Sequence, residues 1–452
     1  MPDDFDVIVV GLGVGGEEVA GRVADAGLEV LVVEKKLVGG ECPYWGCVPS
    51  KIMLRAALSL EESALVDQLA GHAKAAPDWS PVAARVREAT ASWDDSAAVK
   101  RHEEKGSTFV RGAAKMVAPD AVEVDGRRFR ASGAIVLATG GEPSRPPIEG
   151  LDDVAYWTNR EAIEATEPPG SMIVLGGGAI GVELSQVYRA FGTKVTIVEM
   201  APHILSLEEP ENSEALAEVL QAQGMEVVTG AGTERISKRE GKIEVTLAGG
   251  ESVTADQLLV ATGRRSDLRP LGLDAAGLDP EARAIDVDDH LRAAPGVWAV
   301  GDVTGKGQFT HVAVYQGRVA AADILGEPHP PADYRALPRV TFTYPEVASV
   351  GLTEAQARDK GMDVRVGAAE TASSARGWIH GPGAERGVMK LVADGRQGVL
   401  AGASVMSPAA GEVIGLLILA IKERVPIRTL RDLIYPYPTF LRGLEDALDQ
   451  LG

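Results

Sequence analysis

The sequence predicts an α/β fold with two Rossmann-like domains and a C-terminal α+β domain, on three observations. A strand–glycine turn–helix–strand pattern occurs twice before residue 200. Strand-like and helix-like segments alternate in the last quarter of the chain. The 52 glycines and the 5% aromatic content suit tight turns in an α/β protein better than a β-sandwich or a barrel. A chain of 452 residues has room for two to four domains of roughly 100–200 residues each.

Charge and hydropathy limit the classes of partner. The formal net charge is −20, so we expect a soluble protein that binds neither nucleic acid nor an anionic membrane. The N-terminus, MPDDFDVIVV, is acidic and leads directly into a strand-like run, which is not a secretory signal. The most apolar late segment, residues 415–425, is too short to span a membrane and is predicted to be a buried helix. A cytoplasmic location is therefore expected.

The first pattern lies within residues 7–34. An apolar strand is followed by a glycine turn, a helix and a second apolar strand that ends in Glu34. The turn glycines are Gly11, Gly13 and Gly16. In a dinucleotide-binding fingerprint the first glycine makes the turn, the second admits the pyrophosphate and the third lets the helix pack on the strand. The pyrophosphate then faces the positive end of the helix dipole.

The second pattern lies within residues 172–199 and ends in Glu199. Its turn glycines are Gly176, Gly178 and Gly181. In both copies the acid follows the first glycine by 23 residues (34 − 11 and 199 − 176). A single glycine motif is weak evidence in a glycine-rich chain, but the repeated context favours two dinucleotide sites with Glu34 and Glu199 on ribose hydroxyls.

Later segments complete these two domains. Residues 134–141 and 257–265 are near-repeats, and each is predicted to be a strand that ends in an Ala-Thr-Gly turn beside a cofactor. Residues of these turns are Thr139, Gly140 and Gly263. Residues 296–305 form another predicted strand, which leads to Asp302. The predicted domains are 1–147 and 267–333 for the first dinucleotide domain, 148–266 for the second, and 334–452 for the C-terminal domain.

Cys42 and Cys47 are the only cysteines, and three roles compete for them. A metal site needs about four ligands, and the nearest histidine in sequence is His72, so no metal site is predicted. A permanent disulfide is unusual in the cytosol. A redox pair is favoured, because Pro49 indicates that a helix begins at Cys47. The helix dipole, with Lys51 one turn further on, would then favour a thiolate.

The segment from Gly39 to Lys51, GGECPYWGCVPSK, resembles the active-site motif of the flavoprotein pyridine nucleotide-disulfide oxidoreductases. This family includes dihydrolipoamide dehydrogenase and mercuric ion reductase. The segments 301–305 and 338–357 are also similar to family motifs, and they occur in the family's order. The resemblance implies two Rossmann-like FAD/NAD(P)-binding domains plus a C-terminal α+β dimerisation domain. It also implies a homodimer with its active site at the interface.

The resemblance assigns a role to each matching residue. It places FAD on Gly11, Gly13, Gly16, Glu34, Lys51, Thr139, Gly140, Asp302, Thr310 and His311. It places NAD(P)H on Gly176, Gly178, Gly181, Glu199 and Gly263. Glu199 favours NADH, because a carboxylate there repels the 2′-phosphate of NADPH.

The resemblance also implies the electron path. Electrons would pass from NAD(P)H through FAD to the Cys42–Cys47 disulfide and then to a small-molecule acceptor. Cys47 would lie next to the flavin and Cys42 would exchange with the substrate. Lys51 would pair with Glu183.

The C-terminal segment departs from the family. Tyr437 stands where disulfide-processing members have an acid–base histidine, and Arg442 stands at the position of its glutamate partner. A tyrosine with a pKa near 10 is a poor base at neutral pH. The acceptor, which could be a small disulfide, a quinone or a metal, therefore stays open. Dihydrolipoamide oxidation and a degenerate flavoprotein used for binding or sensing are the alternatives.

Three aromatic residues also have more than one expected role. Tyr437 is expected either to line the acceptor site or to pack at the dimer interface, and the two roles have equal weight. Tyr44 and Trp45 replace smaller residues of the family motif. They are expected to pack in the domain, with stacking on an aromatic substrate as the alternative.

Overall fold

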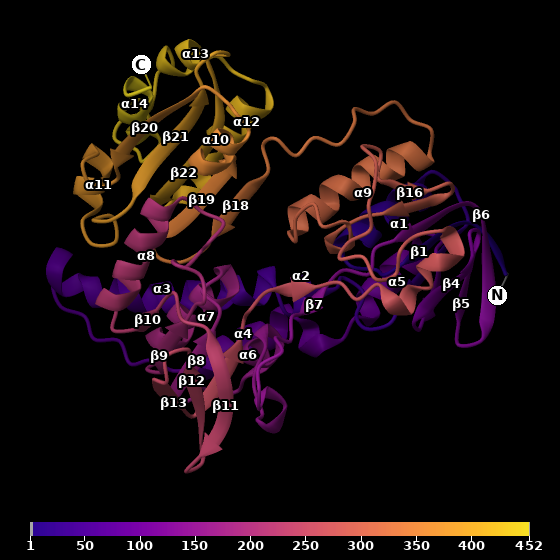
Figure 1. Cartoon of the computed structure of the whole chain (residues 1–452), viewed down its shortest axis with the longest axis horizontal. Helices are drawn as coiled ribbons and strands as arrows, with labels where there is room; N and C mark the ends of the chain where they lie inside the picture. The colour runs from indigo at the N-terminus through magenta and orange to yellow at the C-terminus, as the bar shows by residue number, and fades with distance from the viewer. Residues whose placement is uncertain (1–2, 452) are drawn as a thin grey trace. The chain divides into compact units, whose positions relative to one another are not determined.

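The structure is a computed structural model and describes residues 3–451 (Figure 1). The chain divides into two units, each of which has its own internal organisation. The first comprises Met1–Pro49, Ala84–Ser144 and Gly263–Asp333. The second comprises Ser50–Ala83, Arg145–Thr262 and Tyr334–Gly452.

The first unit is built on a sheet in the order β16-β17-β6-β1-β2-β3, with the β4–β5 hairpin attached to β6. Four neighbouring pairs, from β17 through β6, β1 and β2 to β3, are parallel. The central strands are runs of valine, isoleucine and leucine that are buried on both faces, as parallel strands require. The strand bounds are β1 Asp4–Val10, β2 Val30–Glu34, β3 Thr108–Arg111, β4 Ala114–Ala118, β5 Ala121–Val124, β6 Arg127–Leu137, β16 Arg292–Ala294 and β17 Val297–Ala299, with β7 Glu142–Pro143 paired to β15 Arg264–Arg265.

Two helices of this unit, α1 (Val14–Asp25) and α9 (Thr310–Ile324), lie side by side (Figure 1). They approach closely because glycines stand at the crossing. A Cβ atom on Gly317 would lie 2.9 Å from the carbonyl oxygen of Gly15. The unit also contains α2 Glu41–Tyr44 and α5 Ser96–Glu104, and α3 Cys47–Leu69 and α4 Ser80–Ala89 each run from one unit into the other.

The second unit contains another parallel sheet, in the order β10-β9-β8-β14. It is accompanied by α6 Asn159–Glu164, α7 Ala179–Ala190, α8 Pro210–Ala222 and an antiparallel sheet of β11, β12 and β13. The strand bounds are β8 Ser171–Leu175, β9 Lys194–Val198, β10 Glu226–Val228, β11 Thr233–Arg239, β12 Lys242–Leu247, β13 Ser252–Ala255 and β14 Gln257–Val260. Both glycine fingerprints are therefore strand–turn–helix–strand units, as predicted, although β9 ends one residue before Glu199.

The C-terminal part of the second unit is an antiparallel sheet in the order β18-β19-β22-β21-β20. Helix α12 packs against β19 and β22, and α14 packs against β20 and β21. The bounds are β18 Pro338–Thr341, β19 Glu346–Gly351, β20 Val364–Glu370, β21 Val388–Asp394, β22 Val399–Ser407, α10 Glu354–Asp359, α11 Ala375–His380, α12 Ala410–Lys422, α13 Ile427–Arg431 and α14 Leu444–Asp449.

This architecture confirms the predicted fold class of two Rossmann-like domains and a C-terminal α+β domain. One local prediction needs correction, because the apolar segment 415–425 is not a fully buried helix. Helix α12 buries Ile414, Leu417 and Ile421 on one face and exposes Leu419 on another. Within residues 3–451, no helix is both long enough and apolar enough to cross a membrane. The bounds of the four predicted segments stay a prediction.

Candidate functional site

The three glycines of the first fingerprint meet different surroundings. A Cβ on Gly11 would lie 2.5 Å from the carbonyl oxygen of Ala138, and one on Gly16 would lie 2.1 Å from the carbonyl oxygen of Gly11. Both contacts are far shorter than real side chains make, so backbone packing requires glycine there. A Cβ on Gly13 would instead approach only the Cα of Gly40, at 4.0 Å. The second glycine therefore borders open space.

The second fingerprint repeats this division. A Cβ on Gly176 would lie 2.4 Å from the carbonyl oxygen of Ala261, and one on Gly181 would lie 2.0 Å from that of Gly176. Around Gly178 no atom of the described residues comes within 4 Å of the added Cβ. The first and third glycines of each turn thus serve packing, and the second leaves room for a ligand to approach the backbone.

Each turn ends at the start of a 12-residue helix. Gly13 is the N-cap of α1 and Gly178 is the N-cap of α7. In residues 3–451, no side chain caps either helix with a hydrogen bond. The first amide groups of a helix have no intrahelical partner and carry the positive end of the dipole, so they can bind an anionic pyrophosphate. Both turns therefore fit a dinucleotide.

The two fingerprint acids hold equivalent positions. One carboxylate oxygen of Glu34 accepts a hydrogen bond from the amide of Leu12 at 2.7 Å, and the other accepts from the amide of Lys36 at 2.7 Å. Glu199 accepts in the same way from the amides of Gly177, at 2.6 Å, and Ala201, at 2.7 Å. Because a carboxylate has about four acceptor positions, each keeps two for ribose hydroxyls.

The Ala-Thr-Gly turns lie against these fingerprints. The Cα of Thr139 is 2.8 Å from the position of a Cβ on Gly11, so the turn after β6 closes on the first glycine. Gly140 accepts a hydrogen bond from the hydroxyl of Ser266 at 2.9 Å. Gly263 accepts one from the amide of Ser144 at 2.9 Å. The predicted turn residues are therefore fixed by the backbone.

Asp302 is partly buried beside a cation that was not predicted from the sequence. Burial raises the pKa of Asp302, and the guanidinium of Arg264, whose Nε lies 3.6 Å from the carboxylate, opposes that rise. Arg264 also forms an ion pair with Glu41, with Nη1 and Oε2 3.2 Å apart, and donates to the carbonyl oxygen of Gly141. Arg264 directly follows the Ala-Thr-Gly turn, so its position next to a cofactor turn was the available signal.

Cys47 and Thr310 come together from distant parts of the sequence. Cys47 is the first residue of α3 and Thr310 is the first residue of α9. The sulfur of Cys47 lies 3.1 Å from the hydroxyl oxygen of Thr310. The ring of His311, the next residue, stacks on that of Phe309 with centroids 5.3 Å apart. Thr310, which was predicted to contact FAD, thus contacts Cys47, the cysteine that was predicted to lie next to the flavin.

The cysteines are present as two partly exposed thiols. The hydrogen bond between the Cys42 thiol and Cys47 is the largest cause of a raised Cys42 pKa, and burial adds to the rise. The predicted helix start at Cys47 is correct, so the helix dipole acts on that sulfur. Two adjacent thiols of this kind can be oxidised to a disulfide and reduced again.

Lys51 and Glu183 form the ion pair that the resemblance implied. The Lys51 ammonium lies 2.7 Å from Glu183 Oε2, and the Glu183 side chain is only 6% exposed. The other Glu183 oxygen accepts from the amide of Phe342 at 2.8 Å. The Lys51 ammonium also lies 4.6 Å from the centroid of the Phe342 ring. Phe342 was not predicted, and a phenylalanine after a short strand gives no signal of this role.

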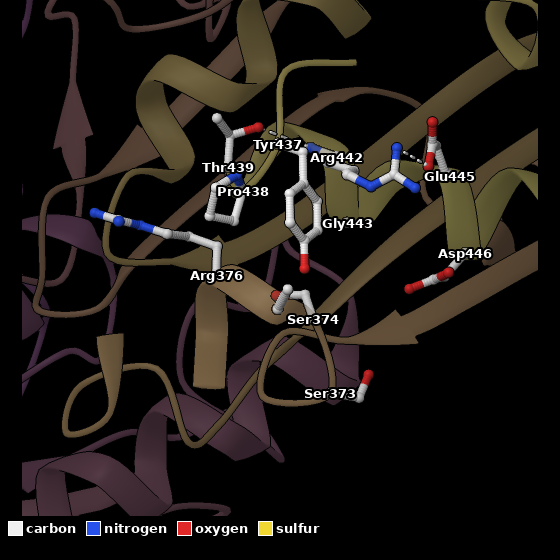
Figure 2. A pocket seen from close by; sticks show the side chains of 11 residues that line it. Ser373, Ser374, Arg376, Tyr437, Pro438, Thr439, Arg442, Gly443, Glu445 and Asp446 are labelled. Atoms are coloured by element: carbon white, nitrogen blue, oxygen red, sulfur yellow. Dashed lines mark hydrogen bonds and ion pairs between the residues drawn. The ribbon is translucent and has the colours of Figure 1, made fainter. Parts of the chain in front are cut away.

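Tyr437 lies on the surface of the second unit. Its side chain is 69% exposed, and the Arg442 guanidinium lies 5.4 Å from the centre of its ring. Arg442 also forms an ion pair with Glu445 at 2.6 Å. Figure 2 shows these residues at a pocket, with the tyrosine hydroxyl directed toward the segment that carries Ser374. Within its own chain, Tyr437 is therefore a surface residue and not part of the core.

The two aromatic residues of the cysteine motif differ in burial. Tyr44 is buried, and burial raises the pKa of its hydroxyl. Its ring lies 5.9 Å from the ring of Trp45, which is partly exposed. Packing therefore accounts for Tyr44, and Trp45 retains an exposed surface.

Family comparison covers almost the whole chain. Residues 5–317 match the family described as pyridine nucleotide-disulphide oxidoreductase, and residues 337–448 match the dimerisation domain of that family. The chain is 34% identical to a mercuric reductase from Bacillus cereus over 453 residues, which cover 98% of this chain and 71% of the relative. It is 35% identical to a dihydrolipoyl dehydrogenase from Thermus scotoductus over 465 residues, which cover 99% of this chain and 97% of the relative.

A solved structure is similar over the full length. It is the Cu(II) complex of the HOCl-induced flavoprotein disulfide reductase RclA from Escherichia coli. The TM-score is 0.86 at 27% identity, and the match covers 100% of both chains. The fold of this chain is therefore similar to that of a flavoprotein disulfide reductase along its whole length.

Proposed function

The chain belongs to the pyridine nucleotide-disulphide oxidoreductase family, and on that premise we propose that it is an NAD(P)H-dependent reductase with a redox-active Cys42–Cys47 pair. Enzymes of this family use FAD to accept a hydride from the nicotinamide and to deliver two electrons to the disulfide. The disulfide becomes two thiols, and the acceptor takes the two electrons and restores the disulfide. Dihydrolipoamide oxidation and a binding or sensing role are the alternatives.

The observation that carries the proposal is the contact between Cys47 and Thr310. Their side chains lie 3.1 Å apart at the starts of two helices, and Cys42 is hydrogen-bonded to Cys47. This geometry supports Cys47 as the sulfur next to the flavin, with Cys42 as the sulfur that exchanges with the acceptor. Thiol exchange requires an accessible thiolate, and Cys42 is partly exposed.

We further propose that Lys51 and Glu183 hold the flavin end of the site. The carboxylate of Glu183 is fixed by the Phe342 amide and keeps the Lys51 ammonium at a set position. A positive charge there would stabilise negative charge that develops on the flavin ring during reduction. The first-fingerprint residues with Asp302 would hold the rest of FAD. The second-fingerprint residues would hold the nicotinamide dinucleotide.

NADH is the proposed nicotinamide nucleotide. Glu199 is held by two backbone amides at the end of β9, where the adenosine ribose binds in such folds. The residues that follow it, Met200 and Ala201, carry no positive charge for a 2′-phosphate. Charge repulsion by Glu199 and the lack of a neighbouring cation both disfavour NADPH.

The proposed acceptor is a redox metal ion or a quinone, with a small disulfide as the less favoured acceptor. Reduction of a disulfide needs a proton for the leaving thiolate, and Tyr437 replaces the histidine that would supply it. Two Cu(II) ions take the two electrons without any proton, and a quinone takes two protons with them from solvent. The relatives include mercuric reductases, and RclA has a Cu(II) complex, which supports this choice.

A homodimer is proposed from the dimerisation domain. Large apolar side chains of this domain are exposed, with Trp378 at 81% and Ile434 at 99%. An exposed apolar surface of this kind indicates an interface. Light scattering of the holoenzyme would test it, because a monomer at micromolar concentration would contradict the proposal.

Anaerobic titration with NADH tests the electron path. The wild-type enzyme should develop a long-wavelength charge-transfer absorbance after two electrons, because a thiolate next to the flavin donates to it. Cys47→Ser should lose that band, whereas Cys42→Ser should show it without added NADH. Two-electron reduction that bleaches the flavin in the wild type with no such band would show that the cysteines are not coupled to FAD.

A panel of acceptors then tests the substrate class. The panel contains Cu(II), a benzoquinone, oxidised glutathione and lipoamide, each with NADH as the reductant. We expect turnover with Cu(II) or the quinone that depends on both cysteines. Turnover that is fastest with a disulfide would overturn the proposed acceptor but not the electron path. No turnover with any acceptor, together with tight NADH binding, would favour the sensing role.

A further inference from the structure

Three metal-ligating side chains meet in the first unit, apart from every residue assigned to the cofactors. His290 precedes β16, Asp323 lies in the last turn of α9, and His329 lies in the segment that follows α9. One ligand atom from each lies within 4.8 Å of the others. Among residues 3–451, this is the one group of three or more such side chains that are so close together. The sequence predicted no metal site, because these residues are not spaced as a motif.

The orientation of the His329 ring leaves a lone pair facing a carboxylate. Its Nδ1 lies 3.0 Å from the carbonyl oxygen of Pro330. A carbonyl oxygen only accepts hydrogen bonds, so Nδ1 carries the hydrogen and Nε2 carries the lone pair in the neutral ring. That Nε2 lies 3.5 Å from Oδ1 of Asp323. In the neutral ring, two acceptors therefore face each other, and either a proton on Nε2 or a metal ion between them would join them.

His290 directs a third polar atom at the same point. Its Nδ1 lies 3.9 Å from the same Oδ1 of Asp323. This nitrogen is buried and has no hydrogen-bond partner among the described residues. Burial of a polar atom without a partner is unfavourable. Both histidine rings, which lie 5.0 Å apart and nearly perpendicular, thus direct a nitrogen at one oxygen.

Asp323 is held firmly by its other neighbours. The Arg292 guanidinium donates to both carboxylate oxygens at 2.6 Å, and the indole nitrogen of Trp298 donates to Oδ2 at 2.8 Å. Oδ2 is therefore fully occupied, whereas Oδ1 has an acceptor position left on the side of the histidines. Outer contacts of this kind orient a ligating carboxylate in metal sites. The positive charge of Arg292 repels a metal ion, and coordination by three converging ligand atoms offsets that repulsion.

We propose that His290 Nδ1, Asp323 Oδ1 and His329 Nε2 bind a divalent first-row transition metal, with Zn²⁺ as the best match. Two imidazoles and one carboxylate are typical zinc ligands. Metal–ligand distances of about 2.0–2.2 Å in a tetrahedron place the ligand atoms roughly 3.3–3.6 Å apart. Of the two separations from Asp323, the one of 3.5 Å to His329 already lies in this range, and the one of 3.9 Å to His290 needs to shorten by only a few tenths of an ångström. The fourth position is left for water.

The consequence of binding is structural. His329 belongs to the segment that leads out of the first unit, and Asp323 and His290 belong to its body. Two hydrogen bonds already hold this segment, from the amide of Ala332 to the Asp289 carbonyl at 2.7 Å and from the amide of Asp333 to the Tyr315 hydroxyl at 2.8 Å. A metal ion at His329 would add a third attachment and fix the start of the connection to the C-terminal domain.

Equilibrium dialysis against Zn²⁺ tests the site. The protein is the full-length FAD holoenzyme, purified without a histidine tag and stripped of metal, with Cys42→Ser and Cys47→Ser to remove thiol ligands. We expect one tightly bound Zn²⁺ per chain and at least tenfold weaker binding in His329→Gln and in His290→Gln. His203→Gln is the matched control, because His203 is a partly exposed histidine whose ring contacts only a backbone carbonyl in the described contacts. Co²⁺ in place of Zn²⁺ should give the intense visible bands of a tetrahedral site.

Two results would overturn the proposal. Zinc affinity in His329→Gln equal to that of the His203→Gln control would place the metal elsewhere. Absence of zinc binding by the parent protein at micromolar free metal would show that the cluster is not a zinc site. His290→Gln keeps the test valid if His329→Gln folds poorly, because the His290 side chain is 40% exposed and tolerates substitution.

Discussion

The division of roles among the fingerprint glycines leads to a prediction with its own controls. Alanine at Gly13 should fold normally but bind FAD weakly, because the added methyl group enters space that the protein leaves open. Alanine at Gly16 should instead damage the fold, because its methyl group would lie 2.1 Å from the carbonyl oxygen of Gly11. Alanine at Gly21, in the same helix α1, is the control, because its nearest neighbour is the end of the Lys105 side chain at 3.7 Å.

The structure sets the expected magnitudes. The Gly16 methyl group needs about 1 Å more room between the turn and α1, and such overpacking typically costs 1–3 kcal/mol or more. Gly21→Ala should stabilise the helix by about 0.5–1 kcal/mol, because glycine is the poorer helix former. The Gly13 backbone, at φ −73° and ψ 178°, suits alanine, so the change in stability should stay below about 1 kcal/mol. The loss of FAD affinity should be at least tenfold, about 1.4 kcal/mol.

Two measurements separate these effects. Flavin fluorescence during dilution gives the FAD dissociation constant, and thermal unfolding of the apoproteins gives the stability. We expect Gly13→Ala to raise the FAD dissociation constant and Gly16→Ala to lower the thermal stability. Gly21→Ala should worsen neither quantity. If Gly13→Ala retained FAD as tightly as Gly21→Ala, the open space at Gly13 would not be the pyrophosphate site.

Four further outcomes follow from charged and polar contacts. Lys51→Met should lower the free energy of unfolding, measured by chemical denaturation, by about 1.5–3 kcal/mol, because it leaves the buried Glu183 carboxylate without its ion-pair partner. Glu183→Gln added to Lys51→Met should restore part of that stability. Burial opposes the charge on Lys390, but three carboxylates outweigh it and raise its pKa. Lys390→Met should therefore cost about 3–5 kcal/mol below pH 10.4. Unfolding at higher pH should show this difference shrinking, because the lysine of the unfolded chain then loses its proton while the ion-paired lysine of the folded protein keeps it. Tyr437→His should raise NADH-dependent lipoamide turnover at least tenfold, toward the 10²–10⁴-fold range of acid–base catalysis, and unchanged turnover would mean that proton supply does not limit this reaction. Glu199→Ser should lower the preference for NADH over NADPH at least tenfold in kcat/KM, and an unchanged ratio would assign the preference to other residues.

The parts of the site that the sequence could predict are those that depend on local chemistry. Each fingerprint is a strand, a turn and a helix in direct succession, and the roles of Gly11 and Gly16 follow from packing within that short span. The start of α3 at Cys47 was predicted from Pro49 for the same reason. The Lys51–Glu183 pair joins residues 132 positions apart, and only the resemblance to a known family made it predictable.

The parts that could not be predicted depend on tertiary contacts without a sequence motif. Arg264 lies between Asp302 and Glu41, and these carboxylates are separated from it by 38 and 223 residues. The cluster of His290, Asp323 and His329 forms because β16, the end of α9 and the following segment fold together. No periodicity or spacing in the chain distinguishes these residues from ordinary surface side chains.

The residues of the site that match the family are those proposed for electron transfer, and the residues that differ are those proposed for proton transfer. Residues suited to electron transfer match the family, namely the contact of Cys47 with Thr310 and the ion pair of Lys51 with Glu183. On the proposed function, the altered part is the one that would supply protons. Tyr437 presents a phenol to solvent and Arg442 is paired with Glu445, so neither position offers the imidazole that both gives and takes a proton in general acid–base catalysis. An enzyme that keeps electron delivery to a thiol pair but lacks a local proton donor is best suited to an acceptor that needs electrons alone or takes its protons from water. Replacement of the histidine is therefore an argument about the acceptor and not evidence that the redox pair has lost its role.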